Sequence, residues 1–286
     1  MKTELHKLNI GIVGGGVVGQ ATAKSLIEHV SEIRIYDTLK ERSTHSLTST
    51  LTDSDLVFIC LPSPAKENGQ CDTSTITQFF RTCAENKLTK TCFVLRSTVP
   101  IGYTQGIMQD YEFHHLVHSP EFLTARCANI DAQLPSRNII GCPESWFRNE
   151  CVSLLHTLYS QRFPSIPIFK MTSSESEAVK LMQNSFFAVK VGFWNEMRCL
   201  ADKLRLDWDI VIQTILSDGR INPSHTQVPG PDGKRGFGGA CLPKDLHNLI
   251  HCFLESGVIP NICMASANRN LVDRDKPSLK IFKENS

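Results

Sequence analysis

The chain has 286 residues, of which 41% are hydrophobic and 21% charged, and its formal net charge is +1 at pH 7. These values are typical of a globular protein of one large or two medium domains, and the balanced charge argues against nucleic-acid or polybasic membrane partners. No apolar run reaches the roughly 18 residues of a membrane span, and the N-terminus does not resemble a signal peptide. We therefore expect a cytoplasmic protein with no membrane partner.

Eleven cysteines are scattered along the chain without a Cys-x-x-Cys pair. Because no secretion signal accompanies them, we expect reduced thiols rather than a disulfide framework. No spacing typical of metal ligands is visible, so we expect no metal site. Six cysteines in apolar or helical surroundings are expected to be small buried hydrophobes. They are Cys60, Cys83, Cys92, Cys199, Cys252 and Cys263.

A glycine-rich turn follows the first predicted strand, at residues 8–13. Gly14, Gly16 and Gly19 form the pattern Gly-x-Gly-x-x-Gly, and a helical pattern comes next. The first glycine allows a tight turn, the second lets a pyrophosphate approach the backbone, and the third lets helix and strand pack. The start of the helix offers unpaired N–H groups to the phosphates.

The second predicted strand, residues 32–36, ends at Asp37, 18 residues past the last glycine. A carboxylate at this place accepts hydrogen bonds from the ribose hydroxyls and repels a 2′-phosphate, which favours NAD over NADP. A glycine-rich turn with a surface aspartate is the structural alternative. The expected cofactor-binding residues are Gly14, Gly16, Val17, Val18, Gly19, Asp37, Pro62, Ser63 and Thr98.

Strands and helices continue to alternate through the first half of the chain. Further strands are predicted at residues 54–61, 91–96, 116–118 and 138–141, with a helix at 75–86. This alternation predicts an α/β fold with a doubly wound parallel sheet. Ser63, Thr98 and Glu121 each follow a strand, and ligands bind beyond the carboxyl ends of such strands. We therefore expect these three residues to line one crevice.

The second half is predicted to be helical. Helices are expected at residues 174–204, 208–216 and 246–257, with another beginning near 262. In the long central helix, apolar residues recur at intervals of three and four, and Lys180 and Asn184 project from the same side. We place the domain boundary so that residues 1–170 form the first domain and residues 171–286 the second.

Residues 236–245 hold three glycines, a cysteine, a proline, a lysine and an aspartate. Packed cores avoid this mixture, whereas it suits backbone that approaches a ligand closely and a thiolate held beside a cation. Because the thiolate is the nucleophilic form of cysteine, Cys241 is a candidate nucleophile. It would need a base, a charge stabiliser and a substrate.

With these residues in place, the chain resembles the UDP-glucose/GDP-mannose dehydrogenase family. The shared motifs occur in family order and cover nearly the whole chain. They are the glycine turn with Asp37 and residues 61–64, 97–100, 119–123, 177–196, 218–221 and 236–245. The resemblance implies a Rossmann-type domain followed by an all-helical domain that carries the catalytic lysine and cysteine.

The resemblance also implies the reaction, in which the primary alcohol of a nucleotide sugar is oxidised to a carboxylate with two NAD. A cysteine captures the intermediate aldehyde, and the thioester formed from it is hydrolysed. The implied catalytic residues are Cys241 as nucleophile, Lys180 and Asn184 as oxyanion stabilisers, Asp245 to position the lysine or a water, and Glu121 and Thr98 for the hydrolytic water. The implied substrate-binding residues are Phe122, Leu123, Arg220, Phe237 and Gly238. Arg220 would reach the neighbouring subunit's site in a homodimer built on the central helix.

Structural interpretations of the same residues stay open. Lys180 could be a solvated helix lysine, Asp245 the N-cap of the helix that follows it, and Glu121 an acid at a helix start. Two other functions also stay open. One is a two-electron NAD-dependent dehydrogenase of a smaller hydroxy compound, in which Cys241 is only a pocket thiol. The other is a non-catalytic NAD-binding protein or partner subunit.

Two departures from the family pattern bear on the substrate. Family members usually continue into a third domain that grips the nucleotide diphosphate, whereas this sequence stops after Asn268–Asn270 and a charged tail. Where the family usually has another glutamate after Pro-Glu-Phe-Leu, this chain has Ala125, followed by Arg126. We expect the first departure to affect affinity for a nucleotide sugar, and the second to affect thioester hydrolysis or substrate choice.

Overall fold

The computed structural model describes residues 4–124, 126–146 and 149–274. The chain forms two compact units. The first unit comprises residues 1–63 and 72–180, and the second comprises residues 64–71 and 181–286. The division falls inside the long central helix, after Lys180. The boundary expected at residue 170 stays a prediction.

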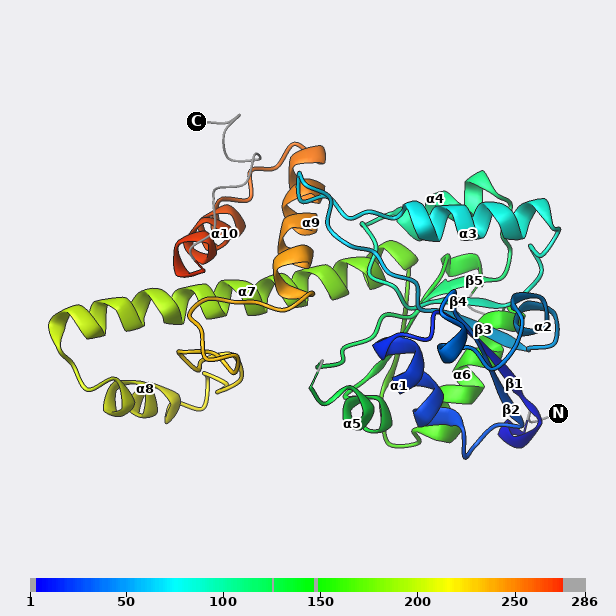
Figure 1. Cartoon of the computed structure of the whole chain (residues 1–286), viewed down its shortest axis with the longest axis horizontal. Helices are drawn as coiled ribbons and strands as arrows, with labels where there is room; N and C mark the ends of the chain where they lie inside the picture. Colours follow the sequence, from blue (N-terminus) through cyan, green and yellow to red (C-terminus); the bar gives the residue numbers. More distant parts are fainter. Residues whose placement is uncertain (1–3, 125, 147–148, 275–286) are drawn as a thin grey trace. The chain divides into compact units, whose positions relative to one another are not determined.

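The first unit is built on a seven-stranded sheet with the order β2-β1-β3-β4-β5-β6-β7 (Figure 1). Its strands are β1 (Asn9–Val13), β2 (Glu32–Tyr36), β3 (Leu56–Ile59), β4 (Phe93–Leu95), β5 (Leu116–His118), β6 (Asn138–Gly141) and β7 (Ile168–Met171). β1 to β5 pair in parallel, which confirms the predicted Rossmann-type fold.

Two features of the sheet differ from the sequence analysis. β6 pairs antiparallel with β5 through His118 and Gly141, although the alternation predicted parallel strands throughout. β7, which pairs in parallel with β6, was not predicted. It is an edge strand whose Phe169 is 48% exposed, so it lacks the continuous apolar run that marks a strand buried on both faces.

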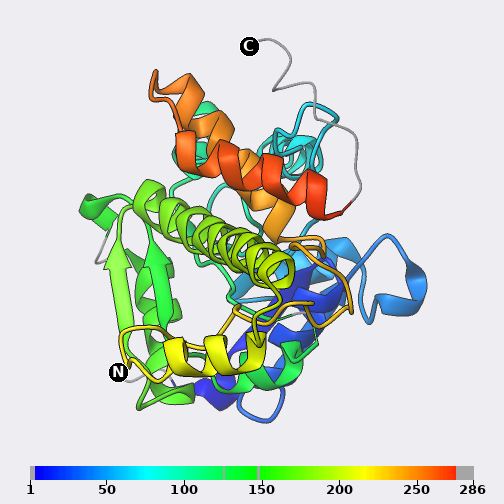
Figure 2. The same cartoon turned by 90° about the vertical axis from the view of Figure 1, so that its left-hand side faces the viewer.

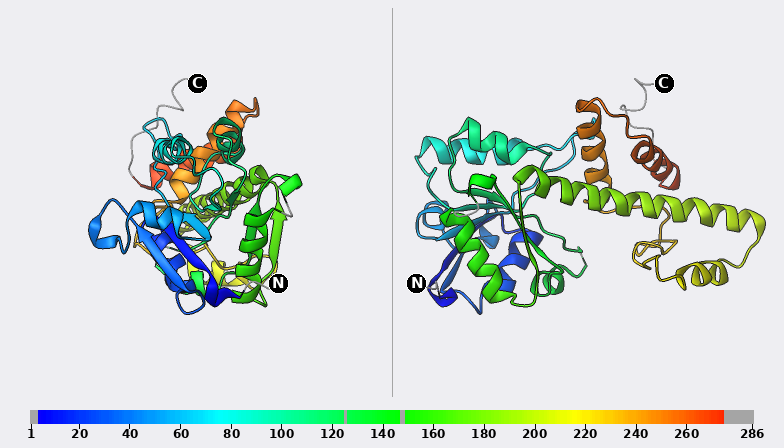
Figure 3. Two further views of the ribbon diagram at one scale, coloured as in Figure 1. Left: turned by 90° about the vertical axis from the view of Figure 1, so that its right-hand side faces the viewer. Right: turned by 180° about the vertical axis from the view of Figure 1, so that it is seen from behind.

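Helices cover both faces of this sheet (Figure 3). They are α1 (Val17–Leu26), α2 (Leu47–Thr52), α3 (Ser74–Glu85), α4 (Tyr103–Asp110), α5 (Ala128–Gln133) and α6 (Glu150–Arg162), with short 3₁₀ helices at Leu5–Lys7, Lys40–Arg42 and Glu144–Trp146. α1 and α6 pack with the sheet in one buried cluster, and α3 and α4 pack on the other face. Phe80, Phe93 and Phe113 meet edge to face in the second cluster.

The second unit is helical, as predicted. It contains the greater part of α7 (Ser173–Leu204) together with α8 (Trp208–Leu216), α9 (Leu242–Glu255) and α10 (Asn261–Asp273). Figure 2 looks along α7 and shows α9 and α10 on one side of it and α8 on the other. Each side has its own apolar cluster, one around Leu246 and Ala267 and one around Trp194 and Trp208.

Helix α9 begins four residues earlier than expected, and this corrects the interpretation of Asp245 as an N-cap. Cys241 takes the N-cap position, Pro243 lies in the first turn, and Asp245 lies inside the helix. Proline is well tolerated in a first turn, because the N–H group that it lacks would have no partner within the helix there. The Leu-Pro-Lys-Asp segment is therefore the start of the helix and not its approach.

Candidate active site

The glycine turn between β1 and α1 has the geometry expected of a dinucleotide site. Gly14 has a φ of +101°, and a Cβ there would lie 2.4 Å from the main-chain oxygen of Cys60. A Cβ on Gly19 would lie 1.9 Å from the oxygen of Gly14, whereas a Cβ on Gly16 would meet nothing within 4 Å. Gly14 and Gly19 are thus required by the fold, and Gly16 leaves open space at the start of α1, where a phosphate is favoured.

Asp37 closes this turn at the end of β2. Its carboxylate accepts hydrogen bonds from the N–H groups of Gly15 at 2.7 Å and Leu39 at 2.9 Å. Burial opposes ionisation, but these two N–H groups and the nearby Arg42 hold the pKa of Asp37 below its usual value. Asp37 is therefore a fixed anion beside the open space at Gly16, which fits the ribose of NAD.

A cavity lies beside the same turn. It is lined by Gly15, Gly16 and Arg42 and by Arg126 and Cys127, which precede α5. Arg126 lies within the described residues and Ala125 does not, so the departure at Ala125 lies outside them. The cavity combines open backbone at a helix N-terminus with two arginines, a combination suited to a pyrophosphate.

The loops after β3 and β4 are joined to each other. The hydroxyl of Ser63 donates to the main-chain oxygen of Thr98 at 2.7 Å, and the hydroxyl of Ser97 donates to that of Leu61 at 2.7 Å. Pro62 is exposed, whereas Ser63 and Thr98 are half-buried. The structure thus brings two of the three predicted crevice residues together at the carboxyl ends of neighbouring strands.

Glu121 follows β5 and is bonded to Lys180 of α7. The Lys180 ammonium donates to the Glu121 main-chain oxygen at 2.7 Å and to its Oε1 at 3.0 Å, and neither residue is more than 8% exposed. The other carboxylate oxygen accepts from the Leu123 N–H at 2.6 Å. Because Lys180 is buried and paired, its interpretation as a solvated helix lysine is wrong.

Two cations lie close to the ring of Phe122. The Arg137 guanidinium is 4.0 Å from the ring centroid, and the Lys180 ammonium is 5.4 Å from it. Phe122, Leu123 and Arg137 also line a cavity together with Glu121. Arg137 was not among the predicted site residues, because an isolated arginine before a strand carries no signal of its own.

A second residue that the sequence analysis missed, Glu177, anchors the start of α7. Its carboxylate accepts from the Gly102 N–H at 2.6 Å, the Thr104 N–H at 2.8 Å and the Thr104 hydroxyl at 2.5 Å. Gly102 is the N-cap of α4 and has no side chain of its own, so Glu177 supplies the capping oxygens from another helix. Burial raises the pKa of Glu177 to about 7, although these hydrogen bonds act to lower it.

In the second unit, Asp245 joins α9 to α7. It is fully buried, and its Oδ2 accepts from the Asn184 side-chain amide at 2.6 Å. Its Oδ1 is paired with Lys244 at 2.6 Å. The Asp245 N–H donates to the oxygen of Cys241 at 2.8 Å, which closes the first turn of α9. The exposed Cys241 therefore stands at a helix N-terminus, where a thiolate is favoured.

Three predicted substrate-binding residues have different surroundings in the structure. Phe237 is only 3% exposed, and its side chain packs in the apolar cluster with Leu246 and Ala267, so it is not available to a ligand. A Cβ on Gly238 would lie 2.9 Å from the Arg274 guanidinium, so the residue that follows α10 fills the space beside this glycine. Arg220 is 89% exposed and paired with Asp218.

The six cysteines expected to be buried divide into two groups. Cys83 and Cys92 are buried, whereas Cys60, Cys199, Cys252 and Cys263 are half-buried. Cys199 is not a simple apolar residue, because its sulfur accepts from Arg235 at 2.8 Å and from Arg269 at 3.0 Å. Sequence position alone gave no sign of these two guanidinium groups, since both come from other segments of the second unit.

Within the described ranges, no helix combines the length and the apolar character that a membrane crossing requires.

Comparisons with known families match both halves of the chain. The model of the UDP-glucose/GDP-mannose dehydrogenase family NAD binding domain matches residues 24–162, and that of the family's central domain matches residues 174–271. The UDP-glucose 6-dehydrogenase of Campylobacter jejuni is 31% identical over 289 residues, which cover 89% of this chain and 69% of that enzyme.

Solved structures share the fold. A UDP-glucose dehydrogenase from Pyrobaculum islandicum superposes with a TM-score of 0.80 at 24% identity, covering 95% of this chain and 70% of the other. A 3-hydroxyisobutyrate dehydrogenase from Mycobacterium tuberculosis superposes with a TM-score of 0.70 at 19% identity, covering 98% of this chain and 100% of the other. At such identities the similarity shows the fold alone, and the fold does not choose between a sugar and a smaller hydroxy compound.

Proposed function

The chain belongs to the UDP-glucose/GDP-mannose dehydrogenase family, and on this basis we propose that it oxidises the primary alcohol of a nucleotide sugar to a carboxylate in two steps. Family membership confirms the predicted enzyme class, an NAD-dependent dehydrogenase, and the predicted cofactor. NAD supplies the hydride acceptor for both steps. Gly16, the N-terminus of α1 and Asp37 are the residues that would hold it.

The observation that carries this proposal is the position of Cys241. An exposed thiol at the N-terminus of α9, with the buried Asp245–Asn184 hydrogen bond one turn into the helix, suits a nucleophile that is held in place. In the proposed reaction, the Cys241 thiol loses its proton and its sulfur bonds to the carbon of the aldehyde formed in the first step, while the C=O π bond breaks and the oxygen takes up a proton. Loss of a second hydride from that carbon to NAD, and of the proton from the oxygen, leaves a thioester. Water then attacks, the carbon–sulfur bond breaks, and the carboxylate leaves while the thiol is regenerated.

Each remaining candidate has a role that suits its surroundings. Lys180 and Asn184 are donors that can stabilise the oxyanion formed on the substrate. Glu121 is a buried carboxylate that can accept a proton from water, and Thr98 carries a hydroxyl that can orient that water. Asp245 holds Asn184 through its 2.6 Å hydrogen bond and so acts as a positioning residue.

We further propose a homodimer built on α7. Five side chains along this helix are more than half exposed and recur at intervals of four and seven residues, so they form one apolar stripe. They are Met182, Phe186, Phe193, Leu200 and Leu204. A stripe of this size is expected to be covered, and a second copy of the same stripe would cover it. The exposed Arg220 is the candidate that would reach the neighbouring subunit's substrate.

The site of action proposed here is the cytoplasm. The sequence has eleven cysteines without a Cys-x-x-Cys pair. Scattered cysteines of this kind suit a reducing compartment.

The test is the number of NADH formed for each substrate consumed. Purified protein is incubated with NAD and UDP-glucose, and separately with GDP-mannose, and we expect two NADH per sugar with one of them. Cys241→Ser should stop the reaction before the acid forms. Cys252→Ser, also on α9, is the matched control and should still give two NADH.

The same experiment separates the alternatives. One NADH per substrate would indicate the two-electron dehydrogenase, with Cys241 as a pocket thiol. Binding of NAD without turnover would indicate a non-catalytic partner subunit. Unchanged acid production by Cys241→Ser would remove the nucleophile role.

A further inference from the structure

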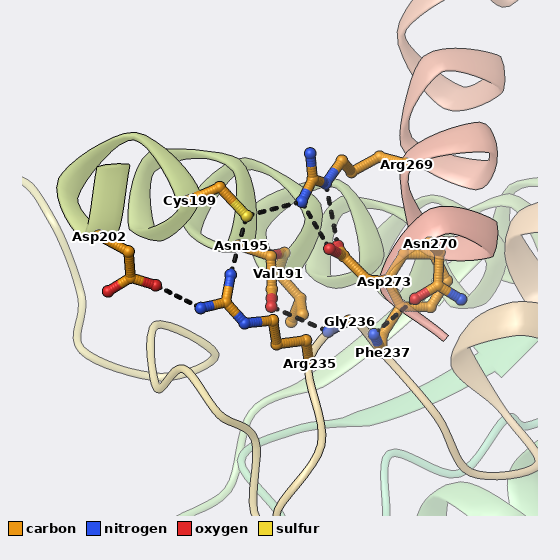
Figure 4. A network of polar contacts seen from close by, with 10 residues as sticks. All are labelled: Val191, Asn195, Cys199, Asp202, Arg235, Gly236, Phe237, Arg269, Asn270 and Asp273. Atoms are coloured by element: carbon orange, nitrogen blue, oxygen red, sulfur yellow. Dashed lines mark hydrogen bonds and ion pairs between the residues drawn. The ribbon is translucent and has the colours of Figure 1, made fainter. Parts of the chain in front are cut away.

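Two buried asparagines hold the start of the segment that carries Cys241 (Figure 4). Asn195 of α7 accepts a hydrogen bond from the Gly236 N–H at 2.9 Å. Asn270 of α10 accepts one from the Phe237 N–H at 2.7 Å. The two asparagines are 1% and 8% exposed. Consecutive N–H groups of one loop are therefore bonded to side chains from two different helices.

The backbone at Gly236 is adapted to this contact. Gly236 has a φ of +69°, and a Cβ there would lie 2.4 Å from the Asn270 side-chain oxygen. The Gly236 main-chain oxygen accepts from Arg274 at 2.9 Å. Both polar atoms of Gly236 and the N–H of Phe237 are thus bonded to side chains. Glycine is required here so that α10 can approach the loop.

Other contacts fix the asparagines and the helix that carries Asn270. The Asn195 amide donates to the Val191 oxygen at 2.8 Å, so its own oxygen faces Gly236. Beside this pair, Arg269 bonds to Asp273 of α10 at 2.6 Å and to the Cys199 sulfur of α7 at 3.0 Å. Figure 4 shows Arg235 reaching the same sulfur from the other side. The network joins α7, α10 and the loop by polar contacts.

We propose that Asn195 and Asn270 are positioning residues for Cys241. They fix the loop at Gly236 and Phe237, the buried Phe237 ring anchors the next point, and the chain then reaches Cys241 at the start of α9. The loop is thus held at the Gly236 N–H, the Gly236 oxygen and the Phe237 N–H, and Phe237 lies four residues before Cys241. The proposal rests on the proposed function of Cys241.

The experiment compares variants at Asn270 that differ in one property. Asn270→Leu keeps the shape of the side chain and removes the acceptor, whereas Asn270→Asp keeps an oxygen for the Phe237 N–H. With whichever of UDP-glucose and GDP-mannose the wild type oxidises, we expect kcat for NADH formation to fall about tenfold to a hundredfold in N270L, the scale of a misplaced reacting group. The KM for NAD should stay unchanged, and N270D should recover most of the loss. Asn268→Leu, an exposed position on the same helix, is the control and should behave as the wild type.

A second measurement does not depend on turnover. The alkylation rate of Cys241 by iodoacetamide, followed by peptide mass spectrometry, should change in N270L and return toward the wild-type rate in N270D. If wild-type protein oxidises no sugar nucleotide, the proposed function fails while this rate still decides the positioning role. An unchanged kcat and alkylation rate in N270L would overturn the inference, as would an N270D variant as impaired as N270L. If N270L does not fold, Asn195→Leu removes the neighbouring contact and is judged by the same criteria.

Discussion

The ammonium of Lys180 lies 2.7 Å from the main-chain oxygen and 3.0 Å from the side-chain Oε1 of Glu121, and both residues are almost completely buried. In a buried lysine–carboxylate pair, removal of either partner leaves the other without compensation. Lys180 is thus bonded to the loop after β5 in the structure, and in the proposed reaction the same ammonium stabilises an oxyanion.

Lys180→Met tests this double role. We expect kcat to fall by about a hundredfold to a thousandfold, because loss of one oxyanion donor has an effect of that size. The affinity for NAD, measured by thermal shift, should be unchanged. Lys203→Met, an exposed lysine at the other end of α7, is the control and should keep wild-type kcat. Wild-type kcat in K180M would show that the lysine is structural only.

Glu177 should make the free energy of unfolding depend measurably on pH. Its pKa is raised by burial to about 7, against the usual 4.5, so the folded state holds an extra proton between these values. The stabilising contribution of Glu177 is therefore fully present below about pH 4.5 and is lost as the pH rises through about 7.

The measurement for Glu177 is the free energy of unfolding of the wild type and of Glu177→Gln from about pH 5 to pH 8. The variant keeps one carbonyl oxygen for Thr104 and loses the titrating group. As the pH rises across this range, the free energy of unfolding of the wild type should fall relative to that of the variant by up to roughly 3 kcal/mol. One pKa unit corresponds to about 1.4 kcal/mol. Parallel curves would contradict the raised pKa.

NAD should protect Cys127 from alkylation. This exposed thiol lines the cavity beside Gly15 and Gly16, where the pyrophosphate is expected. With saturating NAD, its reaction with iodoacetamide should slow at least several-fold, as measured by peptide mass spectrometry. Asp37→Ala, which weakens NAD binding, should remove the protection. Equal rates with and without NAD would place the cofactor elsewhere.

The apolar stripe on α7 predicts that a charged residue placed in it will prevent dimer formation. Phe186→Glu and Phe193→Glu should convert a dimer to a monomer in sedimentation experiments, because a carboxylate is costly to bury without a partner. Ile27→Glu, an equally exposed apolar residue at the end of α1, should leave the dimer intact. A wild-type protein that sediments as a monomer would end the dimer proposal.

The sheet and the long helices could be predicted because their signals are local. The glycine turn, Asp37 and the period of α7 are each contained in one stretch of sequence, and they occur as expected. β7 was missed because an edge strand carries a mixed pattern. The early start of α9 was missed because Asp245 resembles a cap in sequence and is instead satisfied by Asn184.

Residues whose partners are distant in sequence could not be found in this way. Glu177 meets Thr104 across 73 residues, and Asn270 meets Phe237 across 33. A polar residue on a helix gives the same pattern whether it faces solvent or a buried backbone group. Phe237 shows the converse, because the family resemblance implied a ligand contact, whereas its side chain is part of the core.

Helix α7 runs without interruption from Ser173 to Leu204, and the division between the two units falls between Lys180 and Asn184. Four residues along a helix correspond to about 6 Å along its axis. The helix itself therefore fixes the separation of Lys180 and Asn184 along its axis. That separation follows from helical pitch and not from the packing within either unit.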